Sequence, residues 1–157
     1  MRKDNPGPPY RDRGILAAMV DPITELVARL TALPATGDPR LAWAVAHCAQ
    51  SIECSMTAYP KLRSPLFRAT IGRLVKRKFL RAHRMSHDVT APVAGAPTIA
   101  PDTTLDAARE RALAAARAFA TSDGALAPHL AYGRCRKDEY AELHLLHFED
   151  HARALGV

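Results

Sequence analysis

The sequence predicts an all-α protein: a four-helix bundle with a long crossover that contains an extra amphipathic helix. Its 157 residues are 48% apolar and only 6% aromatic, and alanine and leucine dominate. Apolar residues recur at helical spacing over long stretches without proline, a residue that is poorly tolerated inside helices. These proline-free windows are 40–59, 66–91, 102–127 and 129–157.

The first two helices are marked by their boundaries. Asp21 and Pro22 form a typical N-cap followed by proline at the first helical position, and Pro34 ends the helix that they begin. A second helix is expected over about 40–57, where Tyr59 and Pro60 close it.

The middle of the chain predicts an amphipathic helix that begins after Ser64 and Pro65, with basic residues opposite its apolar side. That side comprises Leu66, Phe67, Ile71, Leu74, Val75, Phe79 and Leu80. An extended loop follows over 88–101. Two further helices are expected at about 104–122 and 137–155, ended by Gly124 and Gly156.

The length suits one domain, which we place at 20–157 behind a mobile N-terminal arm at 1–19. No apolar run approaches the roughly 18 residues of a membrane span, so we expect no membrane partner. The three cysteines form no CxxC pair, and their odd number suits a reducing compartment. We therefore expect a cytoplasmic protein.

Positive charge is concentrated in residues 68–84, which hold seven basic residues and no acid, whereas the whole chain carries +6. Such a segment could meet nucleic acid, an acidic partner or anionic lipid. No RNA-binding motif, metal-finger spacing or helix-turn-helix pattern accompanies it, so nucleic acid ranks below a solvated basic face. We call this segment's central residues the basic patch: Arg73, Lys76, Arg77, Lys78 and Arg81.

Histidines are the residues that point to chemistry. His147 and His151 are spaced i,i+4 on the last helix, which stacks two imidazoles on one face within reach of a single ion. His47 lies mid-helix in an apolar stretch and is the natural further ligand, although a hydrogen-bonded core histidine is the alternative. His83 and His87 have the same i,i+4 spacing, but they adjoin a proline-rich loop and are interpreted as a surface pair.

Three further residues are candidates for the surroundings of such a site. Trp43 precedes His47 by one turn and could cover the pocket, with core packing as the alternative. Tyr140 and His144 lie on the same face as the histidine pair of the last helix and are expected to support it.

Four motifs together resemble the DinB-like superfamily of four-helix-bundle metalloproteins, and more closely a bacterial branch of it. They are AHCAQSIE at 46–53, SPLFRATIG at 64–72, Tyr132-Gly133 before the last helix, and the HxxxH motif at 147–151 with Leu-Gly-Val at the end. The resemblance covers about residues 20–157.

The resemblance implies a divalent metal, zinc or nickel first, held by His47, His147 and His151 with coordination positions left open. It also implies a metal-dependent thiol S-transferase-like activity on a small-molecule substrate, with bacillithiol, mycothiol or glutathione as cosubstrate. The alternatives are a catalytically inactive metal-binding bundle and a bundle that binds nucleic acid or an acidic partner. A homodimer is compatible with each. Asp150 and Ala154 depart from the residues common in relatives, which puts catalytic competence in question.

Overall fold

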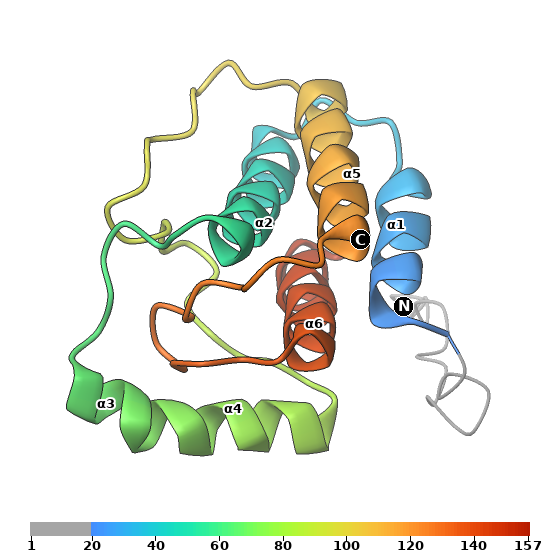
Figure 1. The fold of residues 1–157 in the computed structure, drawn as a ribbon. Helices are drawn as coiled ribbons and strands as arrows, with labels where there is room; N and C mark the ends of the chain where they lie inside the picture. The colour runs from blue at the N-terminus through green and yellow to red at the C-terminus, as the bar shows by residue number, and fades with distance from the viewer. Residues whose placement is uncertain (1–19) are drawn as a thin grey trace, which may run out of the picture.

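The protein is all-helical in the computed structural model, which describes residues 20–157 (Figure 1). These residues form six helices and no strand; an isolated bridge pairs His129 with Gly133. The N-terminal arm expected at 1–19 lies outside the described residues.

Helices α1 (Pro22–Thr31) and α2 (Pro39–Met56) both begin with an aspartate cap followed by proline. The Asp21 carboxylate accepts a hydrogen bond from the Thr24 backbone N–H at 3.0 Å. Asp38 accepts one from the backbone N–H of Arg40 at 2.9 Å. Each cap satisfies a donor that the first turn leaves free, and both helices agree with the prediction to within a residue or two.

The amphipathic helix expected after Ser64 and Pro65 is two helices, α3 (Pro65–Ala69) and α4 (Ile71–Ala82). Thr70 breaks them at φ −116° and ψ −93°, and its hydroxyl donates to the Leu66 carbonyl at 2.7 Å. Helix α4 then lies close to the loop at Ala131, where a Cβ on Gly72 would be 1.9 Å from the Ala131 carbonyl oxygen. The prediction of one continuous helix was therefore wrong.

Helices α5 (Leu105–Thr121) and α6 (Lys137–Leu155) complete the fold close to their expected bounds. The Thr104 hydroxyl caps α5 by accepting from the Ala107 N–H at 3.2 Å. Gly156 ends α6 in the left-handed conformation, at φ 76°.

Four helices pack together: α1 and α2 each lie against both α5 and α6 (Figure 1). Their buried faces form the main core, which includes Leu26, Leu30, Val45, Ile52 and Phe119. Helix α4 lies outside this group and packs on α6 through a smaller cluster of Phe79, Met85, Leu143 and Leu146. The long crossover between α4 and α5 carries the chain back over α2. No helix among the described residues is long and apolar enough to cross a membrane.

The polarity of the α3–α4 segment differs from the prediction at several positions. Leu66, Ile71 and Leu74 were expected on the apolar side, yet their exposed fractions are 74%, 55% and 64%. Lys76 was expected among solvated cations but is buried, and its ammonium contacts Glu139 at 2.8 Å and the Arg134 carbonyl at 3.0 Å. Because α4 docks on α6 and the loop before it, its inner face includes Gly72, Lys76 and Phe79.

Candidate metal centre

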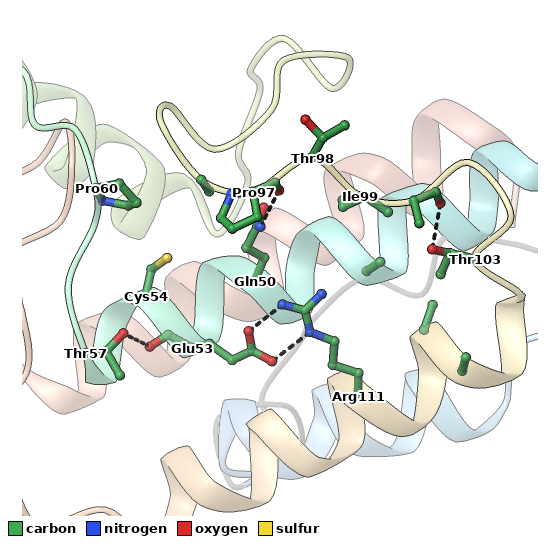
Figure 2. Close-up of a pocket in the computed structure, with 15 residues that line it drawn as sticks. Gln50, Glu53, Cys54, Thr57, Pro60, Pro97, Thr98, Ile99, Thr103 and Arg111 are labelled. Carbon is green, nitrogen blue, oxygen red and sulfur yellow. Dashed lines mark hydrogen bonds and ion pairs between the residues drawn. The ribbon is translucent and has the colours of Figure 1, made fainter.

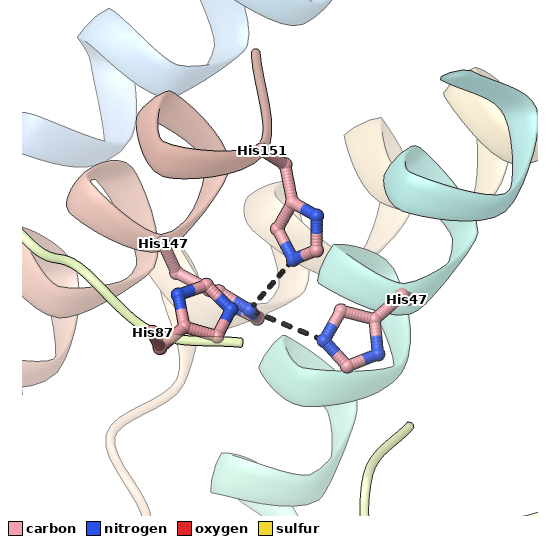
Figure 3. A group of neighbouring side chains, drawn as sticks. All are labelled: His47, His87, His147 and His151. Carbon is pink, nitrogen blue, oxygen red and sulfur yellow. Dashed lines mark hydrogen bonds between the residues drawn. The ribbon is translucent and has the colours of Figure 1, made fainter. Parts of the chain in front are cut away.

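The structure brings His47, His147 and His151 together. His47 projects from the middle of α2, and the other two project from the last turns of α6 (Figure 3). Nε2 of His147 lies 3.2 Å from Nε2 of His47 and 3.2 Å from Nε2 of His151. The two histidines that lie one turn apart on α6 therefore face the single histidine of α2.

His87 is a fourth member of this cluster. One potential ligand atom from each of the four histidines lies within 4.8 Å of the others. The interpretation of His83 and His87 as a surface pair was wrong for His87, because α4 ends at Ala82 and His83 turns left-handed at φ 45°. The chain then carries His87 back to α6, while His83 stays exposed. The i,i+4 spacing marked His87 in the sequence, but only the path of the loop places it.

Asp150 holds His87 in place. One oxygen of its carboxylate accepts from the His87 backbone N–H at 2.9 Å and from the ring at Nδ1, 2.7 Å away. The other oxygen accepts from Arg153 at 2.6 Å. A carboxylate only accepts, so Nδ1 carries the proton and Nε2 keeps its lone pair. Asp150 stood out in the sequence only as a departure from relatives, and nothing in the spacing predicted this contact.

The nitrogen atoms of the cluster fit a cation. Nε2 of His87 is buried without a hydrogen-bond partner. Nε2 of His147 faces two other Nε2 atoms, and a neutral ring nitrogen can donate a proton to only one of them. Lone pairs that converge in this way repel one another unless a positive charge lies between them. Imidazole is a common ligand of zinc, copper, iron and nickel, so the donor set is that of a divalent transition metal.

Burial keeps the imidazoles of His47, His147 and His151 neutral, which is the state that binds a metal. Burial and the nearby His87 lower the pKa of His47 to about 4. Burial and the neighbouring His47 and His87 lower the pKa of His151 to about 3. The pKa of His147 is well below its usual value, first because of burial. At neutral pH, no proton has to leave these three rings before an ion binds.

The residues expected around the site divide into two groups. Trp43 stacks on the His47 ring with 5.0 Å between centroids and also lies 6.2 Å from the His151 ring, so it covers one side of the cluster. Tyr140 and His144 form hydrogen bonds elsewhere: the Tyr140 hydroxyl donates to the Ala127 carbonyl at 2.8 Å, and His144 Nε2 lies 3.1 Å from the Ser55 hydroxyl. Both belong to the core between α2, α5 and α6.

A separate pocket of about 480 Å³ lies between α2, α5 and the crossover, and none of the four histidines lines it (Figure 2). Its charged side chains and Gln50 are paired with other groups of the protein. Glu53 binds Arg111 through two contacts of 2.6 and 2.8 Å, and Gln50 donates to the Pro97 carbonyl at 2.9 Å. These contacts fasten the crossover and α5 to α2.

The structure divides the basic patch into exposed and buried residues. Arg73, Arg77, Lys78 and Arg81 are exposed, as expected, whereas Lys76 is buried against α6.

Comparison with known proteins places the chain in a family. Comparisons with curated proteins and with solved structures found no significant match. The family described as "Protein of unknown function (DUF1569)" matches residues 15–156, which include all four histidines and every helix of the structure. The chain therefore belongs to the DUF1569 family.

Proposed function

We propose that the protein binds one divalent metal ion through His47, His87, His147 and His151, and that its four packed helices form a DinB-like bundle. The convergence of four imidazole nitrogens within 4.8 Å carries this proposal. Two such nitrogens on opposite sides of an ion would be separated by about 4.2 Å, given bonds of ~2.1 Å, so little movement is needed. Zinc and nickel are the ions that we expect first.

We propose further that the site supports the transfer of a low-molecular-weight thiol to a small electrophile. A bound divalent ion would lower the pKa of the thiol and hold the thiolate for attack. Four histidines occupy all coordination positions of a tetrahedral ion. An external thiol can therefore bind only if the ion has a higher coordination number or if one imidazole leaves. His87 lies on a loop held to α6 by Asp150, whereas the other three histidines lie on helices, so His87 is the imidazole that we propose would leave.

The protein's own cysteines do not supply the sulfur in this proposal. Cys48 is buried in the core, and burial raises the pKa of its thiol. Burial also raises the pKa of Cys135 to about 12. Burial and the neighbouring Glu53 also raise the pKa of Cys54. All three thiols stay protonated at neutral pH and are weak nucleophiles, so the thiol of this proposal comes from outside.

Metal content is the first test. Protein reconstituted with zinc or nickel and then desalted should hold about one ion per chain, and His151→Ala should lose it. His83→Ala is the matched control, because His83 is an exposed histidine outside the cluster. If the wild-type protein holds less than about a tenth of an ion per chain, the four histidines are core residues and not a metal site.

Thiol binding is the second test, with cobalt as the probe. Direct sulfur coordination adds a charge-transfer band to the spectrum of the cobalt-loaded protein. Glutathione, cysteine, bacillithiol and mycothiol would be compared, with turnover of monochlorobimane measured beside them. In that reaction a sulfur–carbon bond forms, the carbon–chlorine bond breaks, chloride leaves and the thiol proton passes to solvent. A metal-loaded protein that shows neither the band nor turnover above the His47→Ala variant is an inactive metal-binding bundle.

A further inference from the structure

Asp150 is the carboxylate that joins the crossover to the histidine cluster. It lies on α6 between His147 and His151, its side chain is 8% exposed, and both contacts with His87 reach the same oxygen. Arg153 compensates its charge from the next turn of the helix. The group is therefore a buried, ion-paired carboxylate whose main hydrogen-bond partner is a loop histidine.

The contact has two structural consequences. Because the proton sits on Nδ1, the lone pair of Nε2 points away from Asp150 and toward the other three imidazoles. Because the backbone N–H of His87 is bound as well, the loop itself is attached to α6 at this residue. Histidines that bind metals commonly donate their second ring nitrogen in this way, and the partner sets both tautomer and orientation.

We propose that Asp150 is a positioning residue that makes His87 the fourth ligand of the metal centre. This inference rests on the proposed metal site. The carboxylate of Asp150 sets the tautomer of His87 and also attaches the crossover to α6 beside the ion.

A double-mutant cycle on metal affinity tests the inference. The dissociation constant for zinc would be measured by competition with a chromophoric chelator. His87→Ala and Asp150→Ala should each weaken zinc binding by about 10–100-fold. The double variant should bind zinc as tightly as the single variant that has the lower affinity, because Asp150 acts through His87. Asp150→Asn serves as the variant that keeps the side-chain volume.

The chain offers a matched control on the same helix. Glu142 contacts Nδ1 of His83 at 3.0 Å, but the His83 side chain is 65% exposed and lies outside the cluster. Glu142→Ala should leave zinc affinity within about twofold of wild type. Additive effects of the His87 and Asp150 substitutions, or an Asp150→Ala affinity within that same range, would overturn the inference.

Nuclear magnetic resonance of the metal-free protein separates this inference from the proposed function. The ring nitrogen shifts of His87 should report the Nδ1-protonated tautomer in wild type and its loss in Asp150→Ala, which removes the acceptor. If the wild-type protein shows this tautomer but binds no zinc, the proposed metal site is wrong and the contact between Asp150 and His87 still stands. An Nε2-protonated His87 in the wild type contradicts the positioning role directly.

A second inference rests on an independent observation at the surface of α3 and α4. The described residues include six large aliphatic side chains that are exposed, and four of them are Leu62, Leu66, Ile71 and Leu74. The other two, Val20 and Val157, lie near the ends of the described chain. The four aliphatic residues fall in or beside the segment that holds the excess of positive charge.

A cavity of about 510 Å³ opens between α3, α4 and the loop before α6, and the four aliphatic residues are not part of its lining. Four of its lining residues are cations and none is an acid: Arg68, Arg73, Lys76 and Arg134. Figure 1 shows α3 and α4 lying along one edge of the molecule, outside the four packed helices. The edge therefore combines exposed aliphatic groups with a recess lined by three arginines, in which Lys76 is already paired with Glu139.

We infer that this edge docks on an anionic lipid surface. A bilayer offers phosphate groups to the arginines and acyl chains to the leucines at adjoining depths, whereas nucleic acid leaves the leucines uncovered. A second copy of the chain would bring like charges together. Sequence reasoning expected no membrane partner because no segment could span a bilayer, but docking at the surface requires no spanning segment.

Vesicle sedimentation tests this second inference. At about 0.1 M salt the protein should bind vesicles with about 30% phosphatidylglycerol and not pure phosphatidylcholine vesicles, and high salt should release it. The double variants Leu66→Ser with Leu74→Ser, and Arg73→Glu with Arg77→Glu, should each reduce binding by about tenfold. Val157→Ser and Arg117→Glu are exposed controls elsewhere and should bind as wild type.

Three results would overturn the docking inference. One is no binding to anionic vesicles at this salt concentration. Another is binding that depends on the arginines but not on the leucines, which indicates nonspecific attraction or a nucleic-acid surface. The third is a concentration-dependent dimer that the leucine variant abolishes.

Discussion

His144 shows how neighbouring histidines on one helix acquire different roles. It lies one turn before His147, but its ring stacks on Tyr140 with 5.4 Å between centroids and meets Phe119 edge-on at 5.2 Å. The Ser55 hydroxyl donates to the Ile52 carbonyl at 2.6 Å, so it accepts from His144 Nε2. Burial lowers the pKa of His144 to about 3, and the ring is a neutral core side chain.

Replacing His144 should therefore affect stability and spare the metal. His144→Ala removes a buried ring and leaves Ser55 without its donor, which should lower the free energy of unfolding by about 2–4 kcal/mol. Urea unfolding measures the loss, and elemental analysis should still find about one ion per chain. Loss of the ion at unchanged stability would place His144 in the metal site instead.

The sequence predicted the helical part of the histidine cluster and not the loop part. His147 and His151 share a face because they lie one turn apart in one helix, and His47 stood out by its place mid-helix in an apolar stretch. His87 depends on a left-handed turn at His83 and on a contact with Asp150, which is distant in sequence. Neither follows from local spacing.

At the scale of the elements, Gly72 controls how closely α4 approaches the loop before α6. Gly72→Ala would place a Cβ 1.9 Å from the Ala131 carbonyl oxygen, a backbone atom that cannot rotate away. The substitution should cost about 1–3 kcal/mol of stability, despite the higher helix propensity of alanine. Thermal unfolding measures it against Gly124→Ala, where a Cβ meets nothing within 4 Å. Equal melting temperatures for the two variants would contradict the close contact.

The turn at 129–133 depends on a neutral histidine. Nδ1 of His129 accepts from the backbone N–H groups of Ala131 and Tyr132 at 3.1 and 3.2 Å. Burial, with smaller effects of His144 and Lys76, lowers the pKa of His129 to about 3. Below its usual pKa of about 6.5, the unfolded chain binds a proton that the folded chain does not, so stability falls as pH falls.

His129→Asn should weaken this pH dependence. Asparagine keeps an oxygen that can accept from the turn but does not titrate. Between pH 7 and pH 5 in the presence of a chelator, the wild type should lose up to about 2 kcal/mol more stability than the variant. Urea unfolding at the two pH values measures the difference. Parallel losses in the two proteins would show that His129 does not carry the effect.

The elements themselves were predictable where local signals act. Proline and aspartate set the starts of α1 and α2, and glycine sets the end of α6. The division of the α3–α4 segment was not predictable, because Thr70 interrupts the helix where Gly72 meets a distant loop. Lys76 was misplaced for the same reason: its partner Glu139 lies on α6, and only the docking of the two helices brings them together.

At the scale of the whole molecule, the histidine cluster joins three parts of the chain that are distant in sequence. Helix α2 supplies His47, α6 supplies His147 and His151, and the crossover supplies His87. An ion bound by all four would fasten the crossover and α2 to α6 at one point. The unfolded chain cannot present these nitrogens at the same separation, so the ion should bind the folded state preferentially.

Metal should therefore raise the melting temperature, and above the dissociation constant the rise should follow the logarithm of the free metal concentration. At 100 times the dissociation constant, binding to the folded state alone adds about 2.7 kcal/mol, or about 5–10 °C for a chain of this size. Differential scanning fluorimetry with graded zinc or nickel, and with a chelator, measures the shift. His47→Ala should shift far less than the wild type, while His83→Ala should follow the wild type because His83 lies outside the cluster. Equal shifts in wild type and His47→Ala would mean that the ion binds elsewhere on the surface.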